Sequence, residues 1–415
     1  MNVIAALAER VAALAADDDT AEATRTLVRD TLAVGLAGRI APHAAAVAQA
    51  AEGWGPGAAA QAFVHGFRIH ALEWDAVHEG AVVHALSAVT AAVRAAARRD
   101  GARDLAPMLE AIHAGVEVAC LLGVAATGPL RFFRPATAGA VGAAAAVARL
   151  LGLPPERIAH ALALGVGFAG GTMQAHLEGS VALPLQVAAA ARAGLAAADL
   201  AARGLTGPAG ALDGPFGYFP LFDEGAPDRH VEGFGRRILE VSVKPWPSGR
   251  ASHGVLEALA RVRARHPAAA IARVEAHVPP LVVRLVGRPW RPDMTPAWAR
   301  LCLPFLVALM LADGQIDPRR FHAAAFTDPA LKALGERVRL VNDGNPDPNA
   351  LRPQRIVVHF RDAPPEEVIL PGVLGSPEAP LSAEQRRAKW AFALELAGLP
   401  PDLDPLADLQ RDLAP

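Results

Sequence analysis

Small apolar residues, mostly alanine and leucine, recur every three or four positions through the first ~240 residues, with short Gly and Pro breaks between the runs. This spacing places apolar side chains on one face of a helix and predicts helix after helix. Clear examples are Thr20–Leu36, which follows the acidic run Asp17–Asp19 that suits a helix N-terminus, and Ala138–Leu151. The pattern predicts an all-α domain over residues 1–240.

The period changes near residue 270, where short runs of alternating apolar and polar residues begin. Four of these runs are strand candidates: Val274–Val278, Val338–Val341, Ile356–Phe360 and Glu367–Leu370. Helix-like segments lie between them at Pro296–Ala312 and Asp328–Leu334. Strands and helices mixed in this way predict a small α+β domain rather than a parallel-sheet domain.

Helical character returns over Ser382–Gly398, whose first residues, Ser-Ala-Glu-Gln, resemble a capping box. A helix after the α+β region suggests that the end of the chain packs back on the helical domain. We therefore expect a mainly α protein in which residues 1–240 and 380–415 form one large helical domain. Residues 245–378 are expected to form an inserted, smaller α+β lid.

The charge balance excludes some partners. The chain has 415 residues, with 40 Lys and Arg against 42 Asp and Glu, so it carries no basic surplus for nucleic acid or an anionic membrane surface. Residues 1–10 are amphipathic and acid-containing, unlike a signal peptide, and the apolar run 114–130 is interrupted by Glu117, so no membrane span is expected. The two cysteines, Cys120 and Cys302, lie in apolar surroundings, which favours a reducing, cytoplasmic location.

Lysine is rare in this chain. It occurs only at Lys244, Lys332 and Lys389, while arginine supplies the other basic positions and alanine replaces larger helix formers. That bias is typical of a GC-rich bacterial genome. It also makes each retained lysine a position to inspect for function.

The densest polar cluster is His65 to His84, which contains four histidines together with Glu73 and Asp75. Histidine titrates near neutral pH and a nearby carboxylate can orient it, which favours acid–base chemistry. A zinc site is the weaker interpretation, because His70 and His78 lack the i, i+4 spacing of a helical metal pair and no cysteine joins them. For His65 and His70, a structural role in the core or on the surface is favoured. We expect no metal on any of these histidines.

A second candidate segment runs from Lys244 through Arg250 to His253 and contains two prolines, which keep the backbone extended. Ser252 is positioned to cap the following helix, so the three basic side chains would converge near a helix N-terminus, a place that attracts carboxylate or phosphate. The alternative is a structured hinge whose basic residues pair with surface acids. Spacing alone leaves both open.

A third segment, Arg134 to Gly142 around Thr137, is a glycine-dotted start to a buried helix. It has neither the dinucleotide nor the P-loop glycine spacing, so its small residues are expected to permit close helix packing. A G-x-S-x-G elbow is also missing from the sequence, which gives a serine hydrolase little support.

Taken in order, these segments resemble the MmgE/PrpD family over nearly the whole chain. The resemblance is carried by His70-Ala-Leu-Glu73-Trp-Asp75 with His78-Glu-Gly-Ala-Val-Val-His84, Thr137-Ala-Gly, Gly204-Leu-Thr-Gly-Pro, Gly214-Pro-Phe-Gly-Tyr, Lys244-Pro-Trp-Pro-Ser-Gly-Arg250-Ala-Ser-His253 and Ala388-Lys-Trp-Ala-Phe-Ala. It implies a helical domain built from both chain ends, an α+β lid, a homodimer, and catalysis with no metal or organic cofactor. Family members remove water or carbon dioxide from small polycarboxylic acids such as 2-methylcitrate and cis-aconitate.

The resemblance also implies roles for individual residues. Lys244 and Arg250 would anchor a substrate carboxylate, and His84 or His253 would move a proton on carbon. A carboxylate would orient that imidazole. The expected catalytic residues are therefore Glu73, Asp75, His84 and His253, and the expected substrate-binding residues include His78, Thr137, Lys244 and Arg250.

Three further positions expected at the site depart from the family pattern. Phe133 stands where the family commonly has histidine, Leu183 where it has lysine, and Phe305 where it has tyrosine. Each charge-assisted hydrogen bond is worth about 1.5–3 kcal/mol, so their loss argues against a multiply charged substrate. We expect one wall of the pocket to be apolar and the substrate to be a less charged acid.

These observations lead to one main hypothesis and its rivals. The chain is expected to be a cofactor-independent lyase, either a dehydratase or a decarboxylase, that acts on a small carboxylic acid. A racemase, epimerase or isomerase of the same fold would use similar proton-transfer groups. A noncatalytic binding protein is the rival from another class, and it is favoured if the aromatic residues fill the pocket.

Overall fold

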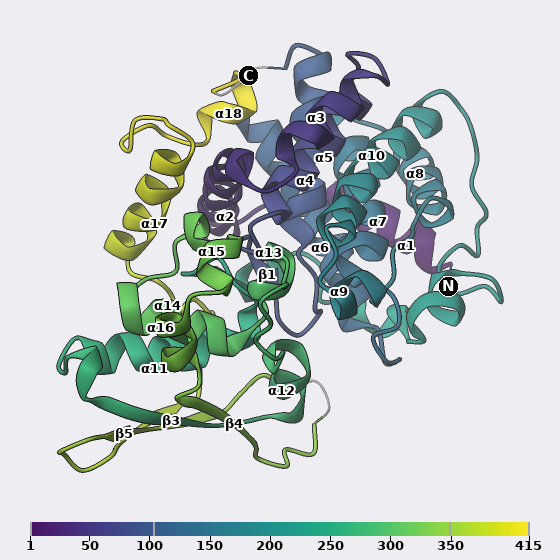
Figure 1. Cartoon of the computed structure of the whole chain (residues 1–415). Helices are drawn as coiled ribbons and strands as arrows, with labels where there is room; N and C mark the ends of the chain where they lie inside the picture. The colour runs from purple at the N-terminus through teal and green to yellow at the C-terminus, as the bar shows by residue number, and fades with distance from the viewer. Residues whose placement is uncertain (1, 103, 348–349, 414–415) are drawn as a thin grey trace.

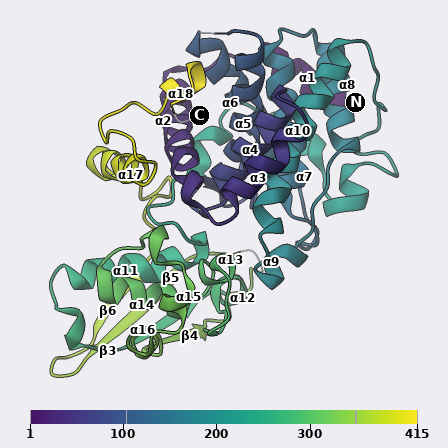
Figure 2. The same cartoon turned by 45° about the horizontal axis from the view of Figure 1, so that its top comes forward.

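The chain folds into a large helical part and a smaller part that contains a sheet, and the two meet along one side (Figures 1 and 2). The computed structural model describes residues 2–102, 104–347 and 350–413. The fold is mainly α with a small sheet portion, as the sequence pattern predicts.

Ten α-helices, counted among the described residues of the first half of the chain, build the helical part. In chain order they are α1 Val3–Ala13, α2 Asp18–Ala37, α3 Ala44–Glu52, α4 Ala58–His70, α5 Ala85–Arg99, α6 Leu105–Val124, α7 Arg134–Leu150, α8 Pro155–Gly167, α9 Gln174–Glu178 and α10 Ala182–Ala202. The expected acidic cap is confirmed, because the Asp17 side chain accepts a hydrogen bond from the Thr20 backbone N–H at 2.8 Å.

Helix α7 lies at the centre of this part and contacts α5, α6 and α10. Glycines set the distance between α6 and α7: a Cβ atom on Gly142 would lie only 2.5 Å from the carbonyl oxygen of Gly115, closer than side chains tolerate. The prediction that small residues in the Arg134–Gly142 segment permit close helix packing is therefore confirmed. This crossing holds α7 tightly enough that its first turn, which carries Arg134, forms a wall of the pocket described below.

Two helices among the described residues, α6 and α10, are long and apolar enough to cross a membrane, and a third span arises if the bent pair 18–40 and 44–52 is counted as one. In this structure 78% of the apolar window of α6 and 50% of that of α10 are buried inside the protein. Their apolar character thus serves the packing around α7.

The smaller part is a mixed sheet covered by helices. Its strands are β3 Ile271–Val278, β4 Val338–Asn342, β5 Gln354–Phe360 and β6 Glu366–Leu370, in the order β4-β3-β5-β6. Strand β4 is parallel to β3 and the other pairs are antiparallel. All four strands fall where the alternating pattern predicts them. The accompanying helices are α11 His253–Arg263, α12 Pro280–Val286, α13 Pro296–Ala299, α14 Leu303–Asp313, α15 Ala323–Phe326 and α16 Pro329–Gly335.

The expected single helix over Pro296–Ala312 is wrong, because the chain breaks into α13 and α14. Pro304 has no backbone N–H and its ring excludes the carbonyl of Arg300 from a continuous helix, so it occupies the first turn of a new one. The break leaves Arg300 and its neighbours in a short turn that faces the helical part.

The last two helices, α17 Ala383–Leu396 and α18 Ala407–Gln410, pack on the helical part, with α17 against α2 and α18 against α5. A capping box between Ser382 and Gln385 begins α17. The buried Lys389 ammonium lies 2.7 Å from an Asp30 carboxylate oxygen, and it also donates to the Trp74 carbonyl at 3.3 Å. A two-stranded ladder of β1 Val77–His78 with β2 Val241–Ser242 joins the start and the middle of the chain.

We predict that Lys389→Met destabilises the protein by about 3 kcal/mol or more, because the substitution leaves the Asp30 carboxylate buried without its cation. Urea unfolding followed by circular dichroism measures the change. Lys332→Met, at an exposed position of α16, is the matched control and should lie within about 0.5 kcal/mol of the wild type. Equal stabilities of the two variants would contradict the role given to this ion pair.

Candidate active site

A pocket with an empty volume of about 760 Å³ lies between the helical part and the sheet-containing part. Its walls are mostly aliphatic and aromatic side chains from both parts, among them Val77, Leu130, Phe133, Met173, Leu183, Leu285 and Leu301. The polar side chains that line it are His70, Glu73, Glu79, His84, Arg134, His176 and Arg250. An apolar pocket with a few convergent polar groups is the usual form of a small-molecule site.

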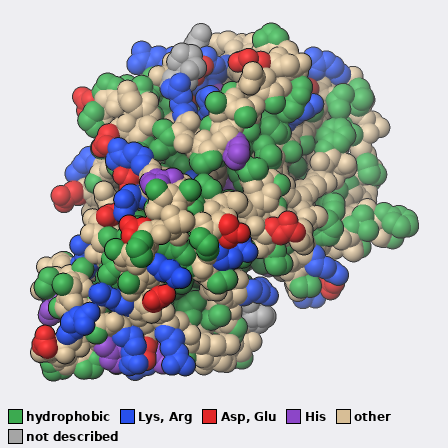
Figure 3. Space-filling view, in the orientation of Figure 1, with side chains coloured by type: hydrophobic (Ala, Val, Ile, Leu, Met, Phe, Trp, Pro, Cys, Tyr) green, Lys and Arg blue, Asp and Glu red, His purple; other side chains and the backbone are tan. Residues whose placement is uncertain are grey.

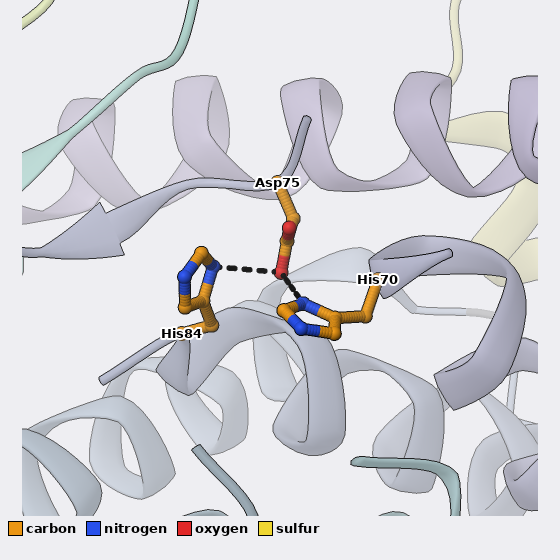
Figure 4. Close-up of side chains that lie close together, drawn as sticks. All are labelled: His70, Asp75 and His84. Atoms are coloured by element: carbon orange, nitrogen blue, oxygen red, sulfur yellow. Dashed lines mark hydrogen bonds and ion pairs between the residues drawn. The ribbon is translucent and has the colours of Figure 1, made fainter. Parts of the chain in front are cut away.

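The buried carboxylate of Asp75 organises the polar side of this pocket (Figure 4). Its Oδ2 atom lies 2.8 Å from Nδ1 of His70 and 3.0 Å from Nδ1 of His84, and it also accepts from the Ser87 hydroxyl. His70 is the last residue of α4, His84 immediately precedes α5, and Asp75 lies in the loop between these helices. The two helix ends therefore bring both imidazoles to one oxygen.

The protons on the two imidazoles follow from these contacts. An ionised carboxylate only accepts hydrogen bonds, so each ring donates from Nδ1 and its Nε2 is directed away from Asp75. Nε2 of His70 is buried and has no hydrogen bond partner among the described residues. The ring centroids are 4.8 Å apart, so both Nε2 atoms can serve the same bound molecule.

The two imidazoles differ in their affinity for a proton. For His70, burial opposes the charged form, but the Asp75 carboxylate outweighs it and raises the pKa above the ordinary 6.5. For His84, burial dominates and lowers the pKa below 6.5, with Lys244 acting in the same direction. Burial would raise the pKa of Asp75, yet the two imidazoles hold it well below its usual value. His70 therefore keeps its proton to a higher pH than His84 does, with the Asp75 carboxylate between them.

Glu73 forms the other wall of this cluster. Its carboxylate accepts from the Lys244 ammonium at 2.9 Å, its backbone carbonyl accepts from the same ammonium at 3.1 Å, and its second oxygen lies 3.9 Å from Nε2 of His70. Burial would raise the pKa of Glu73, but Lys244 lowers it to about 2. The residue has a φ of 56°, a left-handed conformation that side chains other than glycine adopt at a cost. The backbone is strained where the carboxylate meets His70.

The two cations expected to anchor a substrate carboxylate already have partners. Lys244 is fully buried on Glu73. Arg250 donates to Glu79 at 2.7 Å and to the carbonyls of Leu374 and Val373. Of the two interpretations that spacing left open, pairing with acids describes both residues, although these acids line the pocket rather than the surface. Arg250 remains part of the pocket wall, whereas Lys244 lies behind Glu73.

The structure places His253 differently from the expectation that it moves a proton in the pocket. Its ring is completely buried under Trp246, and its Nε2 lies 3.1 Å from the Ser248 hydroxyl oxygen. Burial and the nearby Arg250 hold the pKa of His253 well below its usual value. Ser252 does not cap α11, because its hydroxyl donates to the Gly249 carbonyl at 2.8 Å instead. These groups hold the loop that carries Arg250.

The three positions expected to form an apolar pocket wall do not lie together. Phe133 and Leu183 line the pocket, with the Phe133 ring centroid 5.8 Å from that of His70. Phe305 does not: it lies on the buried face of α14, packed edge-on against the rings of Trp290, Phe321 and Phe326. The core of the smaller part, rather than the pocket, takes this side chain because α14 is apolar on all sides.

His78 and Thr137 lie near the pocket without lining it. His78 Nε2 lies 3.1 Å from a Glu240 carboxylate oxygen, and its Nδ1 accepts from the Ala81 backbone N–H. The Thr137 hydroxyl lies 3.0 Å from that of Tyr218, inside the helical core. Both residues therefore hold neighbouring backbone and helices in place, rather than touching a bound molecule.

His70 is the site residue that the sequence pattern missed, because a histidine at the end of an apolar helix is typical of a core position. The structural role favoured for His65 agrees with its contact with the Arg94 side chain. The available signal for His70 was its position five residues before Asp75, across the helix end. Because the helix ends at His70, the chain that follows can turn back and bring Asp75 next to the His70 ring.

His70, Asp75 and His84 are also the described residues that could hold a metal ion, because one ligand atom from each lies within 4.8 Å of the others. Direct contact between the carboxylate and both Nδ1–H groups satisfies these atoms without an ion. A metal bound through the two Nδ1 atoms would displace the hydrogens that they donate to Asp75. The expectation that no metal binds here stays a prediction.

The fold and pocket together define a two-part, mainly α protein with acid–base groups in an interdomain pocket. The sequence matches the MmgE/PrpD N-terminal domain over residues 3–230 and the MmgE/PrpD C-terminal domain over residues 246–397. The chain belongs to the MmgE/PrpD family, as its motifs predict.

Three relatives are named for one activity. Cis-aconitate decarboxylases of Mus musculus and Homo sapiens are each 30% identical to the chain over 67% of its length. The chain spans about 60% of the length of these two proteins. The cis-aconitate decarboxylase-like protein oryM of Aspergillus oryzae is 28% identical over 94% of the chain and 90% of its own length.

We predict that Asp75→Asn lowers the pKa of His70 from above 6.5 to below it, because the amide removes the charge that opposes burial. NMR titration of the imidazole signals measures this pKa, with the His70 signal assigned by its loss in His70→Gln. Asp213→Asn, at an exposed position, is the control and should leave the His70 pKa unchanged. A His70 pKa that is the same in Asp75→Asn and wild type would show that the carboxylate does not hold its proton.

Proposed function

We propose that this chain is a cofactor-independent lyase that removes water or carbon dioxide from a small carboxylic acid less charged than 2-methylcitrate or cis-aconitate. The observation that carries the proposal is the pair of imidazoles on Asp75, whose pKa values are shifted in opposite directions. Two titratable groups with opposed shifts in one pocket are the usual signature of an acid and a base.

In a dehydration, neutral His84 acts as the base. Its Nε2 removes a proton from the carbon next to the substrate carboxylate, and the electron pair left behind forms the carbon–carbon double bond. The hydroxyl group on the next carbon leaves with the proton of His70 as water. Asp75 orients both rings and stabilises whichever is charged, so it is a positioning residue.

A decarboxylation would use the same groups in a different order. The carbon–carbon bond to one carboxylate breaks, carbon dioxide leaves, and the electron pair stays on carbon. His70 then gives its proton to that carbon, and solvent restores the proton on the imidazole. The relatives named cis-aconitate decarboxylase support this second form of the reaction.

The pairing of charges in the pocket supports a less charged substrate. Lys244, Arg250 and Arg134 each face an acid of this chain: Glu73, Glu79 and Asp223. A tricarboxylate would compete with these acids and would also press against Phe133 and Leu183. Burying a carboxylate without a partner costs several kcal/mol, so the pocket favours an acid with fewer charges.

The geometry argues against two of the rivals. A racemase or epimerase with two bases needs them on opposite faces of the substrate carbon, whereas His70 and His84 share one carboxylate and lie on one wall. A noncatalytic protein is disfavoured because His70, Glu73 and His84 still line one pocket together. An isomerase that returns the proton to a neighbouring carbon on the same face would use the same pair.

We predict that the protein, treated with a metal chelator, converts hydroxy or unsaturated acids that carry one or two carboxylates, and that His84→Asn lowers kcat by about 100-fold or more with little change in KM. Proton NMR in D2O follows the products and separates water loss, carbon dioxide loss and double-bond migration. His266→Asn, in the sheet-containing part, is the control and should retain wild-type kcat.

The pH profile of kcat/KM gives an independent readout. Activity should rise through a pKa below 6.5 as His84 loses its proton, and fall through a pKa above 6.5 as His70 loses its own. No turnover across the acid series, or full activity of His84→Asn, would overturn the proposed function. Activity lost with the metal would instead overturn the cofactor-free mechanism.

We also propose that the protein is a homodimer. Large hydrophobic side chains are exposed on the helical part, among them Phe168, Leu177, Leu205, Phe216 and Leu221, and Phe216 is 86% exposed. In Figure 3 such side chains gather on the right side, over the region of α8 and the chain that follows α10. Apolar patches on a soluble protein commonly mark an interface.

Light scattering is expected to give twice the chain mass of 43.1 kDa at micromolar concentration. Phe216→Glu combined with Leu221→Glu should shift the protein to the monomer, because the added charges would be buried in the interface. Ile369→Glu, which alters an exposed hydrophobic residue of β6, should remain a dimer. A wild-type protein that scatters as a monomer would contradict this proposal.

A further inference from the structure

A second pocket adjoins the first and shares His70, Glu73 and Leu183 with it. Its remaining walls come from the residues just before α3, from the end of α4, from the turn before α10 and from the region of α13. The mechanism above places the reacting carbon beside His70 and His84. A molecule bound there can therefore extend past His70 into this second pocket.

Arg300 also lines this pocket, and none of the roles described so far accounts for it. The residue is only 4% exposed, and its Nε and Nη2 atoms have no hydrogen bond partner among the described residues. Unlike Lys244, Arg250 and Arg134, it has no carboxylate within ion-pair distance in the described part of the chain. A buried guanidinium without a partner is costly, so this group calls for a partner outside the chain, such as water, an ion or a ligand.

The break between α13 and α14 places this side chain. The Arg300 carbonyl accepts from the Gly249 backbone N–H at 3.1 Å, which ties the turn to the loop that carries Arg250. The guanidinium carbon lies 5.2 Å from the centre of the Phe321 ring. The next residue, Leu301, lines the first pocket, so consecutive residues serve the two pockets.

We propose that Arg300 binds the carboxylate of the substrate in the second pocket, while the hydrocarbon chain occupies the apolar first pocket. The inference rests on the proposed function and deepens it. Arg300 is the arginine that lines the second pocket in the described part of the chain, and together with the apolar first pocket it matches an aliphatic acid with a single carboxylate. This is a substrate class with two charges fewer than cis-aconitate.

The same placement selects between the two lyase reactions. A carboxylate held by Arg300 stays on the substrate, and a monocarboxylic acid has no second one to lose as carbon dioxide. The reaction is then loss of water from a 3-hydroxy acid: His84 takes the proton from carbon 2, and the hydroxyl on carbon 3 leaves with the proton of His70. The guanidinium stabilises the charge that develops on the carboxylate as carbon 2 loses its proton.

Calorimetric titration tests this with hexanoate and its neutral analogue hexanamide as probes, without any turnover. Wild type is expected to bind hexanoate more tightly than hexanamide. Arg300→Gln should weaken hexanoate binding by roughly 10- to 100-fold, the value of a charge-assisted contact, and leave hexanamide binding unchanged. Arg291→Gln, an exposed arginine beside Trp298, is the matched control and should bind as wild type.

Arg300→Lys keeps the charge and should recover part of the hexanoate affinity, which a loss of folding in Arg300→Gln could not explain. These titrations measure binding without turnover, so a failure of the proposed chemistry leaves their result intact. Equal affinities of wild type and Arg300→Gln for hexanoate would overturn the inference. So would wild-type affinities that do not distinguish hexanoate from hexanamide.

Discussion

The Asp75 carboxylate is the group on which the site depends, because one of its oxygens accepts from His70, His84 and Ser87 at once. Taking a carboxylate out of water is expensive unless hydrogen bonds and opposite charge replace the solvent. Here the hydrogen bonds that replace water come from the end of α4 and the start of α5. The ionised form of Asp75 is therefore stabilised only when both helices are folded. The contrast between the imidazoles follows, since the shared anion offsets burial for His70 and fails to offset it for His84.

Pairing of charge extends outward from this centre. Glu73 forms an ion pair with Lys244, Glu79 with Arg250 and Asp223 with Arg134. Each pair lies at or behind the pocket wall. In these pairs the charges of Lys244, Arg250 and Arg134 are already balanced by acids of the chain. The loop of Arg250 belongs to the smaller part and its partner Glu79 to the helical part, so the pair also links the two parts across the pocket.

The sequence pattern predicted the architecture well, because periodicity reports which residues must be buried: all four strands, the capped α2 and α17, and the close packing of α7 are found where expected. Asp75 and His84 were expected at the site from the resemblance of their segment to the family, and they contact each other. The partners of the individual side chains could not be predicted, because they depend on which distant segment of the chain packs against each one. Lys244 meets Glu73 across 171 positions, and His253 and Phe305 turn into packed interiors. The helix break before Pro304 was not predicted either, because it lies within an apolar run, and this break places Arg300 in a turn.

Helix α17 has a consequence for how the molecule is made. Lys389 donates to the carbonyl of Trp74, the residue just before Asp75, and it pairs with Asp30 beneath the same loop. Lys389 follows Trp74 by 315 residues, so the segment that steadies the loop of Asp75 is translated long after that loop. Because domains form in order during synthesis, the helices and the sheet can collapse before this contact exists. The contacts that steady the loop of Asp75 would then form only after both parts that line the pocket have been translated.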